Sequence, residues 1–369
     1  MNDRIIIHPI NLPIRLKSIE RWNIPQSEKD YIYRFSDELQ VGRINKGKKI
    51  AQSRVCKYIE SLKVVLNFFG KTIEEITVKD VEDYERAICT GAIKTIKGTI
   101  YKPSTQSDMK QMLKVYVKWR LGNIKAEPLV GWLDTRDVLT TPDFLSEKEI
   151  EKLYKHCKSN HERYLVAILF DSGARAGEFH NIRFEDVKLP EGKDNYVKIE
   201  LKGEYSKTKG RNISLYWKHS TDAVKEFIEE RIGEKIKPHD PVYDYTYNSV
   251  KQFLRRLGQK VLGKNLYPHL FRHSSATFYA SKLNRQQLCY RYGWKFSSDM
   301  PDIYISRAGM NDKELDQQFA STSIEEMKAL LEKQMMMNKL FNEKQEEMQK
   351  ELEQRRKLDP LLNQLIDSP

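Results

Sequence analysis

The spacing of apolar residues over positions 1–125 is helical. In residues 57–70 apolar side chains recur every three or four positions, and Gly70 supplies a stop. The same spacing returns in residues 78–88 and 109–122, with the lysines and arginines on the other faces. The pattern predicts a small helical bundle with basic outer faces, although ordinary solvation accounts for such faces equally well.

A poorly periodic stretch that contains Pro128 and Pro142 follows the bundle. We therefore expect an interdomain linker over residues 126–143. A second domain then opens on a capping box, in which Ser146 and Glu149 each satisfy the other's backbone amide at a helix start.

The second domain, expected over residues 144–310, mixes two periodicities. A buried helix is predicted at 163–170, and two short runs, 197–201 and 212–215, alternate apolar and polar positions around a turn-rich connector. This alternation predicts a β-hairpin with a polar tip. Helical spacing then returns in three segments, 222–232, 249–263 and 268–283. The chain as a whole reads as an α-rich α+β protein.

Residues 311–369 carry one more helical pattern, which opens on a capping box at Ser323 and Glu326. Several a and d positions of a heptad repeat are polar, so a solvated helix with one docking face fits as well as a coiled coil. We expect a C-terminal helical tail and a candidate oligomerisation segment. The apolar heptad positions are Ile324, Met327, Leu331, Phe341, Met348 and Leu352.

The charge of the chain indicates a class of partner. The 369 residues include 64 Lys+Arg and 52 Asp+Glu, a formal net charge of +12. Residues 323–369 hold 8 Lys+Arg and 10 Asp+Glu, which leaves 56 against 42, a net of +14, in residues 1–322. We therefore expect residues 1–322 to bind an acidic partner, with nucleic acid favoured over an anionic membrane surface.

Several protein classes are disfavoured. No run of about 18 apolar residues is present, and the first residues lack the apolar core of a secretory signal. The four cysteines, Cys56, Cys89, Cys157 and Cys289, show no CxxC spacing. We expect a cytoplasmic protein with reduced, mostly buried thiols, no disulfide frame and no zinc site.

The turn after the 163–170 helix is the first candidate for chemistry. Gly173 would end that helix, and Arg175 would start the next one, which contains Glu178. A guanidinium beside the free amides of a helix start suits an anionic oxygen. An arginine in such a turn is also commonly a plain surface residue.

The segment His269-Leu-Phe-Arg272-His273 is the second candidate, with Pro268 at the first helical position. Residues at i, i+3 and i+4 share a helix face, so one cation and two imidazoles would point the same way. This combination suits phosphate binding with proton transfer. For His273 alone a structural role is favoured, and zinc ligation is weak because no Cys or carboxylate completes the site.

Two further segments say little alone. Lys207 and Lys209 lie at the expected hairpin tip, where a lysine can swing into a groove, although basic tips are common. Gly293-Trp294 and the later Tyr304, which lies in a short segment after Pro301, fit ordinary core packing as well as chemistry.

Taken in order, an arginine, a hairpin lysine, HxxRH, Gly-Trp and a late tyrosine resemble the signature of the tyrosine recombinase, or phage-type integrase, family. The likeness is to its Xer-like and archaeal mobile-element branch. The matching segment runs from about 144 to 305, and the helices of 27–125 resemble the family's core-binding domain in pattern only. The resemblance implies a helical DNA-binding domain over 1–125, a catalytic domain with a small sheet over 144–310, and the tail.

The resemblance also implies a role for each motif residue. Glu178 would support the arginine site, and no metal or cofactor would be needed because the arginines stabilise the developing charge. The implied catalytic residues are Arg175 and Arg272 as the clamp on the scissile phosphate, Lys207 as the acid for the leaving 5′-oxygen, His269 in proton transfer, Trp294 as a phosphate hydrogen-bond donor, and Tyr304 as the nucleophile that forms a 3′-phosphotyrosyl bond.

The sequence departs from the family pattern in two places, the spacing before Tyr304 and the several basic residues of the hairpin. Trp294 and Tyr304 are ten positions apart, one more than the family's usual spacing, so that Tyr290 and Tyr292 stay as alternative nucleophiles. Lys207 is preferred over Lys209 as the acid. A phenol has a pKa near 10, so it needs cationic surroundings or a base to react near neutral pH.

The implied function is site-specific recombination by a homotetramer on two double-stranded DNA sites, for DNA integration or for dimer resolution. A type IB topoisomerase would use the same residues without strand exchange. A catalytically silent DNA-binding protein of the same fold and an assembly protein built on the 323–358 helix are the alternatives outside this chemistry.

Overall fold

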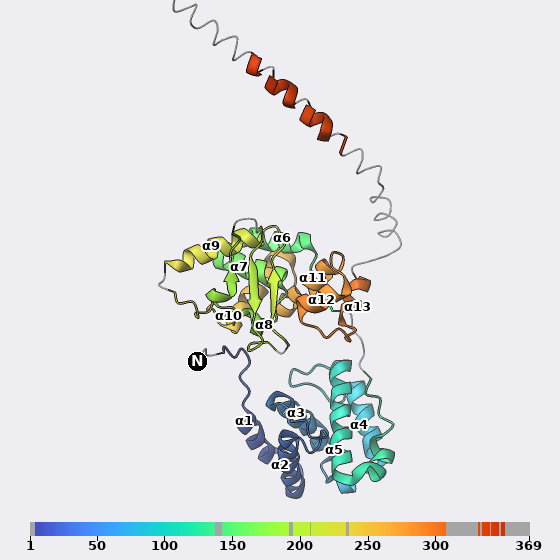
Figure 1. Cartoon of the computed structure of the whole chain (residues 1–369). Coiled ribbons are helices and arrows are strands. Elements are labelled where there is room, and N and C mark those ends of the chain that lie inside the picture. Colours follow the sequence, from blue (N-terminus) through green and yellow to red (C-terminus); the bar gives the residue numbers. More distant parts are fainter. Residues whose placement is uncertain are drawn as a thin grey trace, which may run out of the picture. The chain divides into compact units, whose positions relative to one another are not determined.

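The computed structural model describes residues 4–136, 142–191, 195–206, 208–233 and 236–307, together with 331–350 except for 333, 340 and 347. The chain divides into two compact units, Met1–Pro142 and Asp143–Pro369. Figure 1 shows the first unit in blue to teal and the second in green to orange. Each unit has its own hydrophobic core.

Unit 1 is built from helices, as the apolar spacing predicts. α3 ends at Gly70, whose φ of +64° is a left-handed C-cap. α5 passes through Gly122, where φ +75° and ψ 163° break the helix into two pieces. The elements are α1 (Leu12–Lys17), the 3₁₀ turn η1 (Ser18–Arg21), α2 (Gln26–Val41), α3 (Gln52–Phe69), η2 (Ile73–Glu75), α4 (Val78–Thr90) and α5 (Pro103–Val130).

The segment expected as a linker, residues 126–143, is partly built into unit 1. Ala126, Val130 and Leu133 are all buried in its core. Helical spacing is hard to detect there because Gly122 interrupts the phase and Pro128 lies inside the helix.

Unit 2 surrounds a small antiparallel sheet in the order β1-β2-β3. Ile199 lies opposite Ile213, which confirms the expected hairpin, and a two-residue strand that the sequence does not reveal adds β1. The α-rich α+β class is confirmed. The elements are α6 (Glu147–His156), α7 (Asn160–Ser172), α8 (Ala176–Phe179), η3 (Phe184–Asp186), β1 (Val187–Lys188), β2 (Lys198–Leu201), β3 (Arg211–Ser214), α9 (Ser220–Ile232), α10 (Tyr247–Leu262), α11 (Pro268–Ala280), α12 (Arg285–Tyr292) and α13 (Met300–Arg307).

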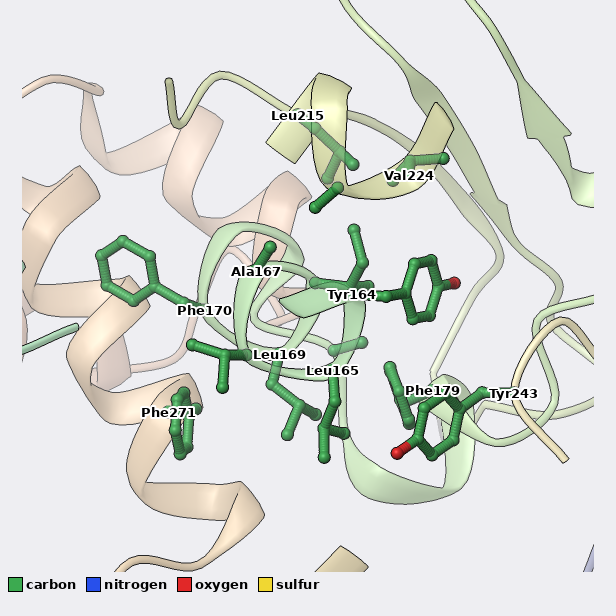
Figure 2. Close-up of a cluster of buried hydrophobic side chains, with 14 of the residues drawn as sticks. Tyr164, Leu165, Ala167, Leu169, Phe170, Phe179, Leu215, Val224, Tyr243 and Phe271 are labelled. Atoms are coloured by element: carbon green, nitrogen blue, oxygen red, sulfur yellow. The ribbon is translucent and has the colours of Figure 1, made fainter. Parts of the chain in front are cut away.

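α7 is the central helix of unit 2, and every residue from Tyr164 to Ser172 is buried. Figure 2 shows its side chains directed to several sides, with Tyr164 near Phe179 and Tyr243. The ring centroids of Tyr164 are 6.1 Å from Phe179 and 6.0 Å from Tyr243. A helix that is buried on all sides must be packed against other elements all round. This packing holds the C-terminal end of α7, and the turn that follows it, in a defined position within unit 2.

The described residues of 331–350 are helical, and their apolar side chains, among them Leu331, Phe341 and Met348, are exposed. Ile324, Met327 and Leu352 lie outside the described residues. In the part of the chain that the structure describes, no helix combines the length and the apolar character of a membrane span. All four cysteines are free, and two of them, Cys157 and Cys289, are buried.

Candidate functional site

Arg175 stands at the turn that follows α7. Gly173 caps α7 with φ +55°, and Arg175 is the N-cap of the short helix α8, as its position in the sequence predicts. Its Nη1 donates to Oε1 of Glu178 at 2.9 Å, and its backbone N–H donates to Oε2 at 2.9 Å. The Arg175 side chain is 26% exposed, so its guanidinium is fixed by Glu178 and is still accessible to a ligand from solvent.

Glu178 is the buried carboxylate that organises this turn. Arg211 donates to it twice, with Nη1–Oε1 at 3.2 Å and Nη2–Oε2 at 2.9 Å, and Ser206 Oγ donates to Oε1 at 2.5 Å. Burial by itself would raise the pKa of Glu178, but the hydrogen bonds and charge of Arg211, with those of Ser206 and the Arg175 amide, lower it to about 2. The carboxylate is therefore an anion at neutral pH.

Arg211 is a site residue that the sequence analysis did not single out. It begins β3 and is buried, and its Nε donates to the carbonyl of Arg291 at 2.8 Å. One pattern points to it: Arg211 falls two residues before the inward-facing Ile213, so the alternation of the strand directs it to the core. A cation at an inward position needs a buried anion, and Glu178 supplies it.

Lys207 lies outside the described residues, but the residues on either side of it are placed. Ser206 bonds to Glu178, and the Thr208 N–H donates to Ser206 Oγ at 3.1 Å. Nη1 of Arg175 also approaches Thr208 Oγ1 at 3.5 Å. Lys209 is exposed. The chain on both sides of position 207 is thus attached to the Arg175 turn.

α11 carries the HxxRH segment, with Pro268 at its first turn as expected. Arg272 is buried, and its Nη1 donates to the Gly173 carbonyl at 2.7 Å while Nη2 donates to the Tyr292 carbonyl at 2.6 Å. Burial and then the charge of Arg175 lower the pKa of Arg272 to about 9. Two neighbouring guanidiniums repel each other unless an anion lies between them, and a phosphodiester is such an anion.

His269 and His273 adopt different positions on α11. His269 keeps an exposed surface, and desolvation, followed by the charges of Arg272 and Arg175, lowers its pKa. His273 is half-buried, and its Nδ1 lies 2.7 Å from the phenolic oxygen of Tyr304. The two imidazoles contact each other edge to face, with centroids 4.5 Å apart.

Tyr304 lies on α13 with only 1% of its surface exposed. The Trp294 ring stacks on the Tyr304 ring at 5.3 Å between centroids and 8° between planes. Burial raises the pKa of Tyr304, against the opposing charges of Arg272 and Arg307. The centroid of the Trp294 ring also lies 5.7 Å from Cζ of Arg272. The indole is therefore packed between the buried guanidinium and the phenol ring.

The loop between Trp294 and α13 is held by Arg285, at the start of α12. Its Nη1 donates to the Phe296 carbonyl and its Nη2 to the Ser298 carbonyl, both at 2.8 Å. Nε and Nη2 also bond to the carboxylate of Asp302 at 3.0 and 3.3 Å. One side chain therefore makes hydrogen bonds to several points of the loop that separates the tryptophan from the tyrosine by ten positions.

Unit 2 thus brings most of the expected site residues to one place. The charges of Arg175 and Arg272 lower the pKa of His269, the charge of Arg175 lowers that of Arg272, and Tyr304 contacts His273 and Trp294. Among the described residues no cluster of three or more His, Cys, Asp or Glu is arranged to hold a metal ion. The arrangement can bind an oxyanion between two guanidiniums beside a phenol and two imidazoles.

Unit 2, which carries this site, is similar to a known protein family. Residues 143–309 match the model of the phage integrase family. Over these residues the chain resembles that family, in agreement with the order of the motifs in the sequence.

Proteins with similar sequences are named tyrosine recombinases. The chain is 24% identical over 224 residues to tyrosine recombinase XerA of Saccharolobus solfataricus, covering 60% of this chain and 70% of that protein. It is 26% identical over 254 residues to a tyrosine recombinase of Pseudothermotoga lettingae, covering 67% and 83%.

Solved structures share the fold. A lambda integrase dimer bound to a COC′ core site aligns with a TM-score of 0.55 at 15% identity, covering 82% of this chain and 83% of that one. The Tn1549 transposon integrase in complex with transposon right end DNA aligns with a TM-score of 0.54 at 17% identity, covering 78% and 99%.

Proposed function

We propose that this protein is a site-specific DNA recombinase that cleaves and rejoins double-stranded DNA through a 3′-phosphotyrosyl intermediate on Tyr304. The observation that carries the proposal is the gathering of Arg175, Arg272, His269 and Trp294 beside one buried tyrosine. Several relatives named as recombinases, and structural neighbours solved in complex with DNA, support the same chemistry.

In the proposed reaction the phosphodiester binds between the guanidiniums of Arg175 and Arg272. Tyr304 Oη attacks phosphorus, the bond from phosphorus to the 5′-oxygen breaks, and Lys207 delivers a proton to that oxygen. The arginines stabilise the charge that collects on the nonbridging oxygens during attack. Religation runs the same steps in reverse, with a 5′-hydroxyl as nucleophile. Only 1% of Tyr304 is exposed, so DNA binding must displace part of what covers the phenol.

Lys207 is proposed as the acid in preference to Lys209. Both neighbours of Lys207 are attached to the Arg175 turn, through the Ser206–Glu178 and Thr208–Ser206 bonds, whereas Lys209 is exposed. A proton donor must reach the leaving oxygen, and a residue anchored on both sides of its position beside the phosphate clamp fits this need better.

A suicide duplex, nicked so that the cleaved end diffuses away, tests the proposal. We expect the wild type to form a covalent protein–DNA adduct and Tyr304→Phe to form none. Tyr290→Phe is the matched control, because Tyr290 is exposed and lies on α12. An adduct that survives Tyr304→Phe and disappears with Tyr290→Phe or Tyr292→Phe would contradict the assignment.

We propose a homotetramer on two DNA sites as the working assembly. A lambda integrase tetramer bound to a Holliday junction is among the structural neighbours, with a TM-score of 0.52. Recombination between two sites, compared with relaxation of one supercoiled plasmid, separates this assembly from a topoisomerase. Truncation after residue 322 tests the tail: DNA binding kept with tetramer lost would assign the tail to subunit contacts.

A further inference from the structure

The phenol of Tyr304 makes its hydrogen bond with His273. Nδ1 of His273 and Oη of Tyr304 are 2.7 Å apart, a normal length for such a bond. The two rings lie close to parallel, at 26° and 6.0 Å between centroids. With its proton on Nε2, the imidazole presents the Nδ1 lone pair to the phenolic O–H, in the geometry that a proton transfer needs.

His269 is differently placed. It lies one helical turn before His273 on α11, is exposed, and feels the charges of Arg272 and Arg175. An imidazole beside the phosphate clamp is suited to contact the substrate. The imidazole that touches the nucleophile is His273.

His273 lies close to two arginines, Arg272 and Arg307, and to His269. Burial, then His269, Arg307 and Arg272, lower the pKa of His273 to about 4, so that the free protein holds a neutral imidazole near pH 7. The groups that face it are His269 and Arg272 from α11, and Tyr304 and Arg307 from α13. A bound phosphodiester adds negative charge beside these cations, which makes the imidazole more basic when the substrate is in place.

We propose that His273 is a catalytic base that accepts the phenolic proton of Tyr304 during strand cleavage. The inference rests on the proposed function. In the step, the Tyr304 proton moves to Nδ1 while Oη forms its bond to phosphorus, the bond to the 5′-oxygen breaks, and that oxygen takes a proton from Lys207. On religation the imidazolium returns its proton to the departing Tyr304 oxygen, which balances the cycle without a further reactant.

Single-turnover cleavage of the suicide duplex tests the assignment. We expect His273→Ala to slow cleavage by about 10²–10⁴-fold, which is the usual range for loss of a base, with less than about a twofold change in DNA affinity. His273→Asn keeps a polar group near the Nδ1 position but cannot take the proton, so we expect a similar loss. Ser281→Ala, at the exposed C-terminal end of the same helix, is the matched control and should cleave like the wild type.

Rescue by a more acidic phenol separates a base from a positioning contact. A fluorinated tyrosine installed at position 304 ionises more readily and needs a base less. In the His273→Ala background we expect it to restore cleavage by at least about tenfold, and in the His269→Ala background by less. Raising the pH should favour the His273→Ala variant in the same way, because more of the phenol ionises unaided.

Three results would overturn the inference. If His273→Asn cleaves at the wild-type rate, the hydrogen bond between His273 and Tyr304 only positions the phenol and transfers no proton. Cleavage by His273→Ala at or above the wild-type rate would mean that the bond only holds the phenol in its buried arrangement. Failure of the acidic phenol to restore His273→Ala, in protein that unfolds and binds DNA like the wild type, would exclude proton transfer. Absence of any adduct from the wild type would instead contradict the proposed function itself.

Discussion

Arg211 and Glu178 form a buried ion pair in which Nη1 and Nη2 of the guanidinium each donate to one carboxylate oxygen, at 3.2 and 2.9 Å. Each of the two side chains is 2% exposed. The same carboxylate positions Arg175, so the pair joins β3 to the turn that presents the proposed phosphate clamp.

Loss of Arg211 is therefore expected to damage both stability and chemistry. Arg211→Met leaves a buried carboxylate with fewer partners, which costs about 3–5 kcal/mol in the free energy of unfolding. Urea unfolding of unit 2 measures this cost. Lys209→Met, two residues away and exposed, is the matched control and should change stability by less than about 0.5 kcal/mol. Equal effects of the two substitutions would contradict the role of the pair.

The depressed pKa of Glu178 predicts a dependence of stability on pH. Its folded pKa of about 2 lies below the ordinary 4.5, so the ionised form stabilises the fold above pH 4.5 and the contribution is lost as the pH falls towards 2. A shift of this size corresponds to roughly 3 kcal/mol. Glu178→Gln removes the titration, so the stability difference between wild type and variant should narrow between pH 5 and pH 3. A constant difference would show that Glu178 does not titrate in this range.

The bonds of Arg285 predict how α13 is held. Arg285→Ala removes two contacts to loop carbonyls and the pair with Asp302, so hydrogen exchange should become faster across residues 294–307 and cleavage should slow. Asp302→Asn keeps the contacts of Arg285 to the loop carbonyls. Because the Arg285–Asp302 ion pair is half exposed, its loss should lower the free energy of unfolding by less than about 1 kcal/mol. If Asp302→Asn were the more damaging change, the ion pair rather than the loop contacts would hold α13.

Gly173 is expected to resist substitution more than a second left-handed glycine of the same unit. Its φ is +55°, and an added Cβ would stand 2.4 Å from Cε1 of Tyr292. At Gly263, with φ +67°, no atom lies within 4 Å of an added Cβ. Gly263→Ala should cost about 1–2 kcal/mol for the backbone alone. Gly173→Ala should cost about 1–3 kcal/mol more for the overlap, as measured by thermal unfolding.

The two lysines of the hairpin can be told apart by the leaving group. With an ordinary duplex, Lys207→Ala should slow cleavage by about 10²–10⁴-fold, because the 5′-alkoxide needs a proton. A duplex with sulfur at the bridging 5′ position releases a thiolate, which needs no acid, so most of the loss should disappear. Lys209→Ala should cleave both duplexes like the wild type. The reverse pattern would make Lys209 the acid.

The sequence predicts the elements that have a regular period. The hairpin follows from alternation around Ile199 and Ile213, and α3 from apolar spacing with a terminal glycine. β1 is not predicted because a strand of two residues is too short to show a period. The helix over residues 126–133 is not predicted because Gly122 and Pro128 disturb the helical spacing of the apolar residues.

The site is predicted as a set of residues but not as a set of contacts. His273 and Tyr304 are 31 positions apart, and only the packing of α13 on α11 makes them partners. Considered alone, His273 favours a structural role, because local spacing says nothing about a distant helix. Arg211 and Arg285 act through partners on other elements in the same way, so that neither belongs to a recognisable motif.

The burial of Tyr304 has a consequence for the free protein. A phenol that is 1% exposed and hydrogen-bonded is shielded from electrophiles in bulk solvent. Tyr290, which is 55% exposed, would be nitrated or iodinated long before it. In the absence of DNA, the tyrosine proposed to attack phosphorus is therefore among the least reactive tyrosines of the chain, and chemical labelling would reveal it only once the substrate has opened the site.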